Sequence, residues 1–219
     1  MERTNLGITA KAEQKILGKL INIIPDFVTP DMMTLLALLA AVGIGASYYF
    51  ANEYRGFYLL AIIFYFLHWF GDSLDGKIAR EKKKPRPNYG YYIDHMIDSL
   101  SIFIVILGLT VSATTYTNAW VWVLVGFLLL MIHTFLKTNV IKRFDLSVGF
   151  MGFTEIRLLG MAFSALLFFI GNPLIFGGDY PLNFLDVIGI IVAIPMWIVL
   201  VTQIVSTSKE LDRKDRKEW

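Results

Sequence analysis

The chain has 219 residues, of which 56% are hydrophobic and 15% aromatic, and its formal net charge is +2. Soluble domains rarely reach such values or a mean hydropathy of +0.58, so the composition favours an integral membrane protein. The chain contains no cysteine, which excludes disulfides and thiol chemistry.

The first part of the chain predicts a helix at the membrane surface. Residues 8–24 carry apolar side chains at helical spacing, with Lys11, Lys15 and Lys19 on the other side. We expect an amphipathic interfacial helix within a segment spanning residues 1–30. A soluble packing helix is the alternative, and no secretory signal peptide is expected.

Six hydrophobic segments follow, each close to the roughly 20 residues that a membrane-crossing helix needs. They cover residues 31–50, 56–76, 90–113, 119–138, 156–176 and 183–206. We therefore predict an all-α integral membrane protein with six transmembrane helices over residues 31–206, followed by a charged tail over 207–219. The fifth segment is ambiguous, because Asn172 and Pro173 could end its helix early.

The basic residues predict the orientation. Of the 20 lysines and arginines, 19 lie in the amino-terminal segment, around residues 77–86, in residues 137–157 or in the tail, and the other is Arg55. The positive-inside rule places these four regions, and both termini, in the cytoplasm. No feature indicates binding to nucleic acid.

Two pairs of aspartates stand on either side of a basic linker that contains prolines. In helices, each pair lies on one face with small or basic residues: Asp72, Asp75, Gly76, Ala79 and Arg80, then Gly90, Asp94 and Asp98. Two facing helices would bring four carboxylates together. Such a group of oxygen ligands suits hard cations such as Mg²⁺, Mn²⁺ or Ca²⁺.

The depth of the two pairs supports one shared site. At about 1.5 Å per residue, Asp72 lies roughly 22 Å from Phe57 and Asp98 roughly 24 Å from Thr114. Both pairs are then level, just inside the cytoplasmic face of a core about 30 Å thick. Carboxylates at this depth indicate cation binding or a water-filled cavity.

These residues resemble the signature of the CDP-alcohol phosphotransferase family, D-x2-D-G-x2-A-R followed by G-x3-D-x3-D. All eight fixed positions are present, although the spacer between Arg80 and Gly90 has nine residues where eight are usual. The resemblance implies transfer of a substituted phosphoryl group from a CDP-linked donor to an alcohol, with release of CMP. It also implies a homodimer.

By this resemblance, two Mg²⁺ or Mn²⁺ ions are expected at Asp72, Asp75 and Asp94. Asp98 is expected at the edge of the metal site, as general base for the attacking hydroxyl.

The resemblance also implies a nucleotide site on the same helix. Gly76 and Ala79, beside Asp72, would let the cytidine approach, and Arg80 would hold a phosphate. Thr34 belongs to a segment similar to the family's P-N-x-x-T, in which Asp31 replaces the commoner asparagine.

Cations beyond the motif are candidate phosphate or acceptor contacts. They are Lys142, Arg143 and Arg157, and Glu155 is a candidate to orient an acceptor. Positive-inside anchoring explains the cations equally well, and a carboxylate at a helix start needs no further role.

The histidines are expected to have mainly structural roles. His68 lies one turn before Asp72 and is a candidate hydrogen-bond partner for it, while packing or structural roles are favoured for His95 and His133.

The substrates stay open at this stage. The short chain favours CDP-diacylglycerol with a small polar alcohol, in the manner of compact bacterial enzymes of the inner membrane. The D-H-x-x-D-S and T-E-I-R segments resemble enzymes that transfer from CDP-choline or CDP-ethanolamine to diacylglycerol. A membrane prenyltransferase is disfavoured because all four aspartates lie within about 27 residues. A divalent-cation transporter is disfavoured because an ion path needs polar residues through the whole membrane, and the outer halves of the second and third hydrophobic segments are almost wholly apolar.

Overall fold

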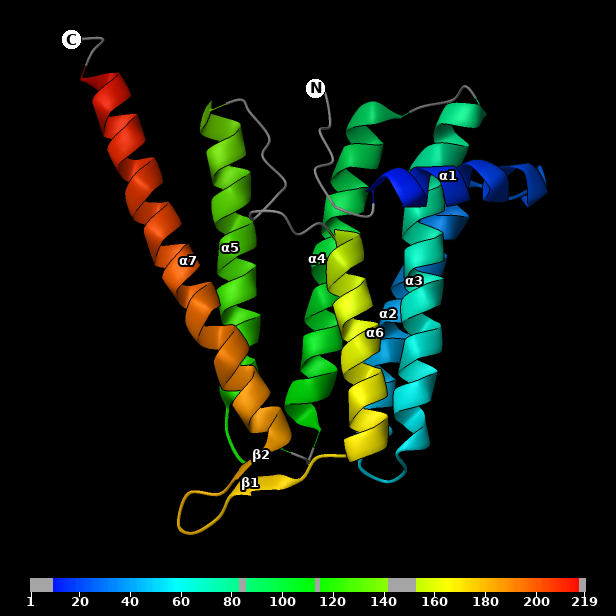
Figure 1. Cartoon of the computed structure of the whole chain (residues 1–219). Helices are drawn as coiled ribbons and strands as arrows, with labels where there is room; N and C mark the ends of the chain where they lie inside the picture. Colours follow the sequence, from blue (N-terminus) through cyan, green and yellow to red (C-terminus); the bar gives the residue numbers. More distant parts are fainter. Residues whose placement is uncertain (1–9, 83–85, 113–114, 142–152, 217–219) are drawn as a thin grey trace. The chain divides into compact units, whose positions relative to one another are not determined.

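The computed structural model of the chain describes residues 10–82, 86–112, 115–141 and 153–216. This part of the chain is mostly helical, with one short β-hairpin (Figure 1). The elements are α1 (Ala10–Leu20), the 3-10 helix η1 (Ile21–Ile23), α2 (Pro30–Phe50), α3 (Gly56–Glu81), α4 (Pro87–Val111), α5 (Ala119–Ile141), α6 (Phe153–Ile170), β1 (Leu174–Phe176), β2 (Leu182–Asn183) and α7 (Phe184–Asp215).

Five of the described helices are long and apolar enough to cross a membrane: α2, α3, α4, α5 and α7. They correspond to five of the six hydrophobic segments, so these helices are confirmed, whereas six crossings and the orientation stay predictions. The expected fifth segment, 156–176, corresponds to α6, which ends before Asn172 and Pro173, as the alternative for this segment allowed. Helix α6 ends at Ile170, because Gly171 adopts a left-handed conformation with φ 69° and residues 174–176 form a strand.

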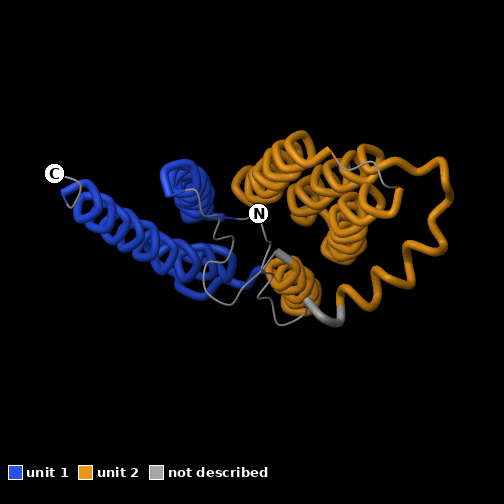
Figure 2. The backbone as a smooth tube through the Cα atoms, turned by 90° about the horizontal axis from the view of Figure 1, so that it is seen from above, with its two compact units in different colours: residues 1, 114–146, 172–219 blue, residues 2–113, 147–171 orange. Residues whose placement is uncertain are grey.

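The chain divides into two compact units (Figure 2). The orange unit in Figure 2, here called the site unit, holds α1, η1, α2, α3, α4 and α6. The blue unit, here called the hairpin unit, holds α5, the hairpin and α7. The four motif aspartates and Arg157 all belong to the site unit.

Helix α2 is the scaffold of the site unit, since it packs against both α3 and α4. Its buried face is built largely from small residues, which allow close approach. A Cβ added at Gly71 of α3 would lie 2.6 Å from the Met33 carbonyl oxygen, and one at Gly108 of α4 would lie 2.3 Å from that of Gly45. Glycine at both positions therefore sets the distance of α3 and α4 from α2.

Helix α1 lies across the direction of α2, α3 and α4 (Figure 1). Its Leu17 is buried in a cluster with Val28, Leu74 and Ile78, while Lys15 and Lys19 are exposed. A helix over Ala10–Leu20 is therefore confirmed, and its Leu17 packs on the end of α3 that carries the motif, while the position of α1 at a membrane surface stays a prediction. Residues 1–9 lie outside the described part.

Within the hairpin unit, a buried carboxylate at the start of α7 joins two segments. Asp186 has no exposed surface. It accepts hydrogen bonds from the backbone nitrogens of Tyr116 (3.1 Å), Thr117 (2.8 Å) and Asn183 (3.1 Å), and from the Thr117 hydroxyl (2.7 Å). Asp186 thus ties the segment before α5 to the start of α7.

We expect Asp186→Ala to destabilise the protein. A buried donor left without a partner costs about 1–3 kcal/mol. The Asn183 nitrogen is buried and the other three donors are partly buried and can reach water, so the total loss should be about 3 kcal/mol. The midpoint of thermal unfolding, followed by tryptophan fluorescence in detergent, should fall by roughly 6 °C or more. Asp179→Ala, which removes an exposed carboxylate from the same unit, is the control. Equal midpoints for the two variants would contradict this account.

Candidate metal and phosphate site

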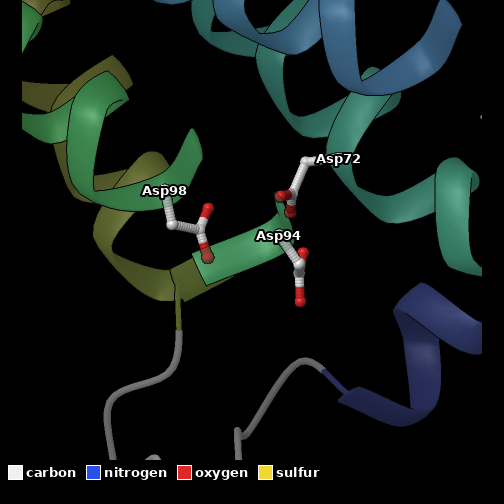
Figure 3. A group of neighbouring side chains, drawn as sticks. All are labelled: Asp72, Asp94 and Asp98. Carbon is white, nitrogen blue, oxygen red and sulfur yellow. The ribbon is translucent and has the colours of Figure 1, made fainter. Parts of the chain in front are cut away.

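Three aspartates meet between α3 and α4. Asp72 belongs to α3, whereas Asp94 and Asp98 lie one turn apart on α4, and the three side chains lie next to one another (Figure 3). One carboxylate oxygen from each lies within 4.8 Å of the others. Asp98 is buried, and Asp72 and Asp94 are half-buried. The structure therefore brings together three of the four carboxylates that the helical spacing predicted to meet.

A buried arginine from α6 lies against this group. The Nη2 atom of Arg157 is 2.7 Å from Asp72 Oδ2 and 3.6 Å from Asp98 Oδ1. Only 9% of the Arg157 side chain is exposed, so the two ion pairs lie inside the protein rather than at its surface. Arg157 was predicted as a phosphate or acceptor contact, and the structure places it directly on the aspartate group.

The fourth motif aspartate is held by α2. Asp75 is not one of the three carboxylates grouped above. Its Oδ2 accepts a hydrogen bond from the Thr34 hydroxyl at 2.7 Å, and its Oδ1 accepts one from the backbone nitrogen of Gly76. Thr34, predicted as a nucleotide contact, is thus a partner of Asp75, and the role of Asp75 in metal binding stays a prediction.

The other predicted residues of this region are placed as follows. Ala79 is half-buried and Arg80 exposed on the last turns of α3. A Cβ at Gly90 would meet no atom within 4 Å, so the start of α4 is open there. Glu155 stands half-buried in the first turn of α6. Lys142 and Arg143 lie outside the described residues.

The histidines differ in their surroundings. His95 is buried, with Nδ1 2.7 Å from the Tyr91 carbonyl oxygen and its ring against the Tyr91 ring, as expected of a packing residue. His68 is also buried, and its Nδ1 has no hydrogen-bond partner among the described residues. The same holds for Nε2 of His133.

Sequence reasoning missed one residue near the site, Glu13 of α1. It accepts hydrogen bonds from Trp69 and Ser73 of α3 and from Thr154 of α6. A sequence signal existed, since Glu13 lies one turn before the buried Leu17 and so places a carboxylate on the apolar face of the helix.

The aspartate group suits a divalent cation. Carboxylate oxygens are the ligands that Mg²⁺ and Mn²⁺ prefer. With all groups ionised, three carboxylates and the Arg157 guanidinium leave a formal charge of −2, which one dication would neutralise. Asp72, Asp94 and Asp98 could hold such an ion from two helices, with Arg157 beside it to contact an anionic ligand.

The comparisons with known proteins point the same way. A model of the CDP-alcohol phosphatidyltransferase family matches residues 27–205. The fold is similar to that of Mycobacterium tuberculosis phosphatidylinositol phosphate synthase (PgsA1) in two solved structures, one with CDP-DAG bound and one in complex with manganese and citrate. Each has 17% sequence identity and a TM-score of 0.56. The first match covers 92% of both chains, and the second covers 91% of this chain and 87% of that one. No curated protein matches.

We expect Arg157→Gln to lower stability when divalent cations are removed with a chelator. Removing one partner of a buried ion pair typically costs about 3–5 kcal/mol, because the remaining charges are left buried and unpaired. The thermal midpoint in detergent with chelator measures the loss.

Arg86→Gln is the matched control. Arg86 pairs with Asp31, but both side chains are 51% exposed, so this variant should lose less than about 1 kcal/mol. An equal effect of the two substitutions would show that the Arg157 pairs are not stabilising.

Proposed function

The chain belongs to the CDP-alcohol phosphatidyltransferase family and is thus a transferase of substituted phosphate groups, and we propose that it transfers a phosphatidyl group from CDP-diacylglycerol to a small polar alcohol. The observation that carries the proposal is the group formed by Asp72, Asp94, Asp98 and Arg157. It combines ligands for a cation with a cation for a phosphate, as a pyrophosphate substrate requires.

The proposed metal site uses Mg²⁺ or Mn²⁺. Asp72 and Asp94 would hold the first ion together with an oxygen of Asp98, and Asp75 would contribute to a second. When bound, such ions neutralise charge on the pyrophosphate and stabilise the attacking and leaving oxygens. The manganese in the PgsA1 complex supports this choice.

The proposed chemical step breaks the bond between the β-phosphorus of the donor and the bridging oxygen, which leaves with CMP. The acceptor oxygen forms the new bond to that phosphorus, and its proton passes to Asp98. The burial of Asp98 supports this role, because a carboxylate shielded from water is the better proton acceptor. Arg157 holds the transferred phosphate from the α6 side.

The proposed nucleotide site lies along the last turns of α3. The absence of a side chain at Gly76 and the small one at Ala79 would leave room for the cytidine beside Asp72, and the exposed Arg80 would reach a phosphate. Thr34 would act on this site through its hydrogen bond to Asp75.

The donor is proposed from two observations. PgsA1 was solved with CDP-DAG bound, and the match covers 92% of that chain. The acceptor is a small polar alcohol whose identity the assay below determines. The distribution of basic residues supports a cytoplasmic active site, with both termini on that side. A bacterial inner membrane is proposed because the short chain resembles the compact bacterial members of the family. A homodimer is proposed from the family resemblance.

CMP release by the purified protein in detergent with Mn²⁺ or Mg²⁺ tests the proposed reaction. CDP-diacylglycerol is offered with glycerol 3-phosphate, serine, inositol or inositol phosphate, and CDP-choline or CDP-ethanolamine is offered with diacylglycerol. We expect CMP that depends on the acceptor in an arm with CDP-diacylglycerol. Asp98→Asn should lower its rate by roughly 100-fold or more, the usual contribution of a general base.

Asp179→Asn serves as the control for that substitution, because Asp179 is exposed and belongs to the hairpin unit. CMP only in the arms with diacylglycerol as acceptor would reverse the proposed direction of transfer. No CMP in any arm from folded protein would refute the proposed substrates.

A further inference from the structure

The carboxylate of Glu13 joins two helices of the site. Its Oε1 accepts hydrogen bonds from Trp69 Nε1 at 2.9 Å and from Ser73 Oγ at 2.8 Å, both on α3. Its Oε2 accepts one from Thr154 Oγ1 at 3.1 Å, on α6. One oxygen therefore binds α3 and the other binds α6. A single side chain of α1 thus fixes the distance between α3 and α6 next to the site.

The partners of Glu13 are direct neighbours of the site residues. Ser73 follows Asp72 in the chain, and Trp69 precedes it by one turn. Thr154 lies one turn before Arg157, on the same face of α6. The ion pair between Asp72 and Arg157, at 2.7 Å, joins the same two helices. The Glu13 contacts and this ion pair thus form two successive links between α3 and α6.

The rest of α1 is placed so that Glu13 can hold this position. Leu17, one turn further along, is buried against Leu74 and Ile78 of α3. The Lys77 ammonium group donates to the Gln14 carbonyl oxygen at 3.4 Å. Because these contacts fix α1 on α3, the hydrogen bond that the Thr154 hydroxyl donates to Glu13 also fixes the start of α6.

We propose that Glu13 is a positioning residue, which holds the start of α6 so that Arg157 faces the phosphate-binding site. Helix α1 is then part of the active-site scaffold, in addition to any role at the membrane surface. This inference rests on the proposed function, since it assumes that Arg157 contacts a phosphate of the substrate.

The test measures the binding of CDP, which carries a pyrophosphate, to the purified full chain in detergent with Mn²⁺, by titration calorimetry. We expect Glu13→Ala to weaken CDP binding about tenfold, within the range of coupling between contacting residues. Glu13→Gln keeps one oxygen that can accept hydrogen bonds from α3, and its amide nitrogen can donate to the Thr154 hydroxyl of α6. This variant should therefore keep most of the affinity. Gln14→Ala, which removes the neighbouring exposed side chain and keeps its carbonyl, should bind CDP like the unchanged chain.

A double-mutant cycle tests whether Glu13 positions Arg157 or only stabilises the packing of α1. If Glu13 acts through Arg157, Glu13→Ala should have no further effect on CDP affinity in the Arg157→Gln background. An unchanged affinity in Glu13→Ala, or an equal loss in both backgrounds, would overturn the proposal. Should Glu13→Ala not fold, Thr154→Val removes only the link to α6 and should weaken binding about threefold. If the unchanged chain fails to bind CDP, the proposed function itself is refuted.

Discussion

The site depends on the neutralisation of buried charge. Asp72 and Asp98 lie inside a bundle of mostly apolar helices, where an unpaired carboxylate is strongly unfavourable. Arg157 supplies one positive charge from a third helix, and the group keeps a formal charge of −2 with Asp94 included. This excess of negative charge is the physical reason for the proposed dication, which would in turn attract the negative charge of a pyrophosphate.

The helices around this charge group are arranged to keep it in place. Close contacts at Gly71 and Gly108 set α3 and α4 against α2, and Thr34 of α2 binds Asp75. On the other side, α6 presents Arg157, and Glu13 of α1 connects α6 to α3. Helices α1, α2, α3, α4 and α6 thus contribute to a site whose three aspartates come from a short stretch of sequence.

Local periodicity predicted much of this arrangement, and tertiary contacts account for the rest. Residues four apart share a helix face, so Asp94 and Asp98 could be placed together from the sequence, and the motif predicted their partner Asp72. The partner of Asp75 could not be predicted, because it depends on how α2 packs against α3. The sequence could place Glu13 on the apolar face of its helix, but its partners depend on how α1 packs against α3 and α6. Hydropathy alone could not place the end of α6, because it continues past Gly171, where the backbone turns into a left-handed conformation.

The most direct test of the account is the position of manganese in crystals of the protein grown with Mn²⁺ and CDP. Anomalous scattering at the manganese edge locates the ion independently of any assumption about the fold. The account predicts a peak coordinated by carboxylate oxygens of Asp72, Asp94 and Asp98, with the pyrophosphate between the metal and Arg157. A manganese peak away from these aspartates, with CDP bound elsewhere, would contradict it.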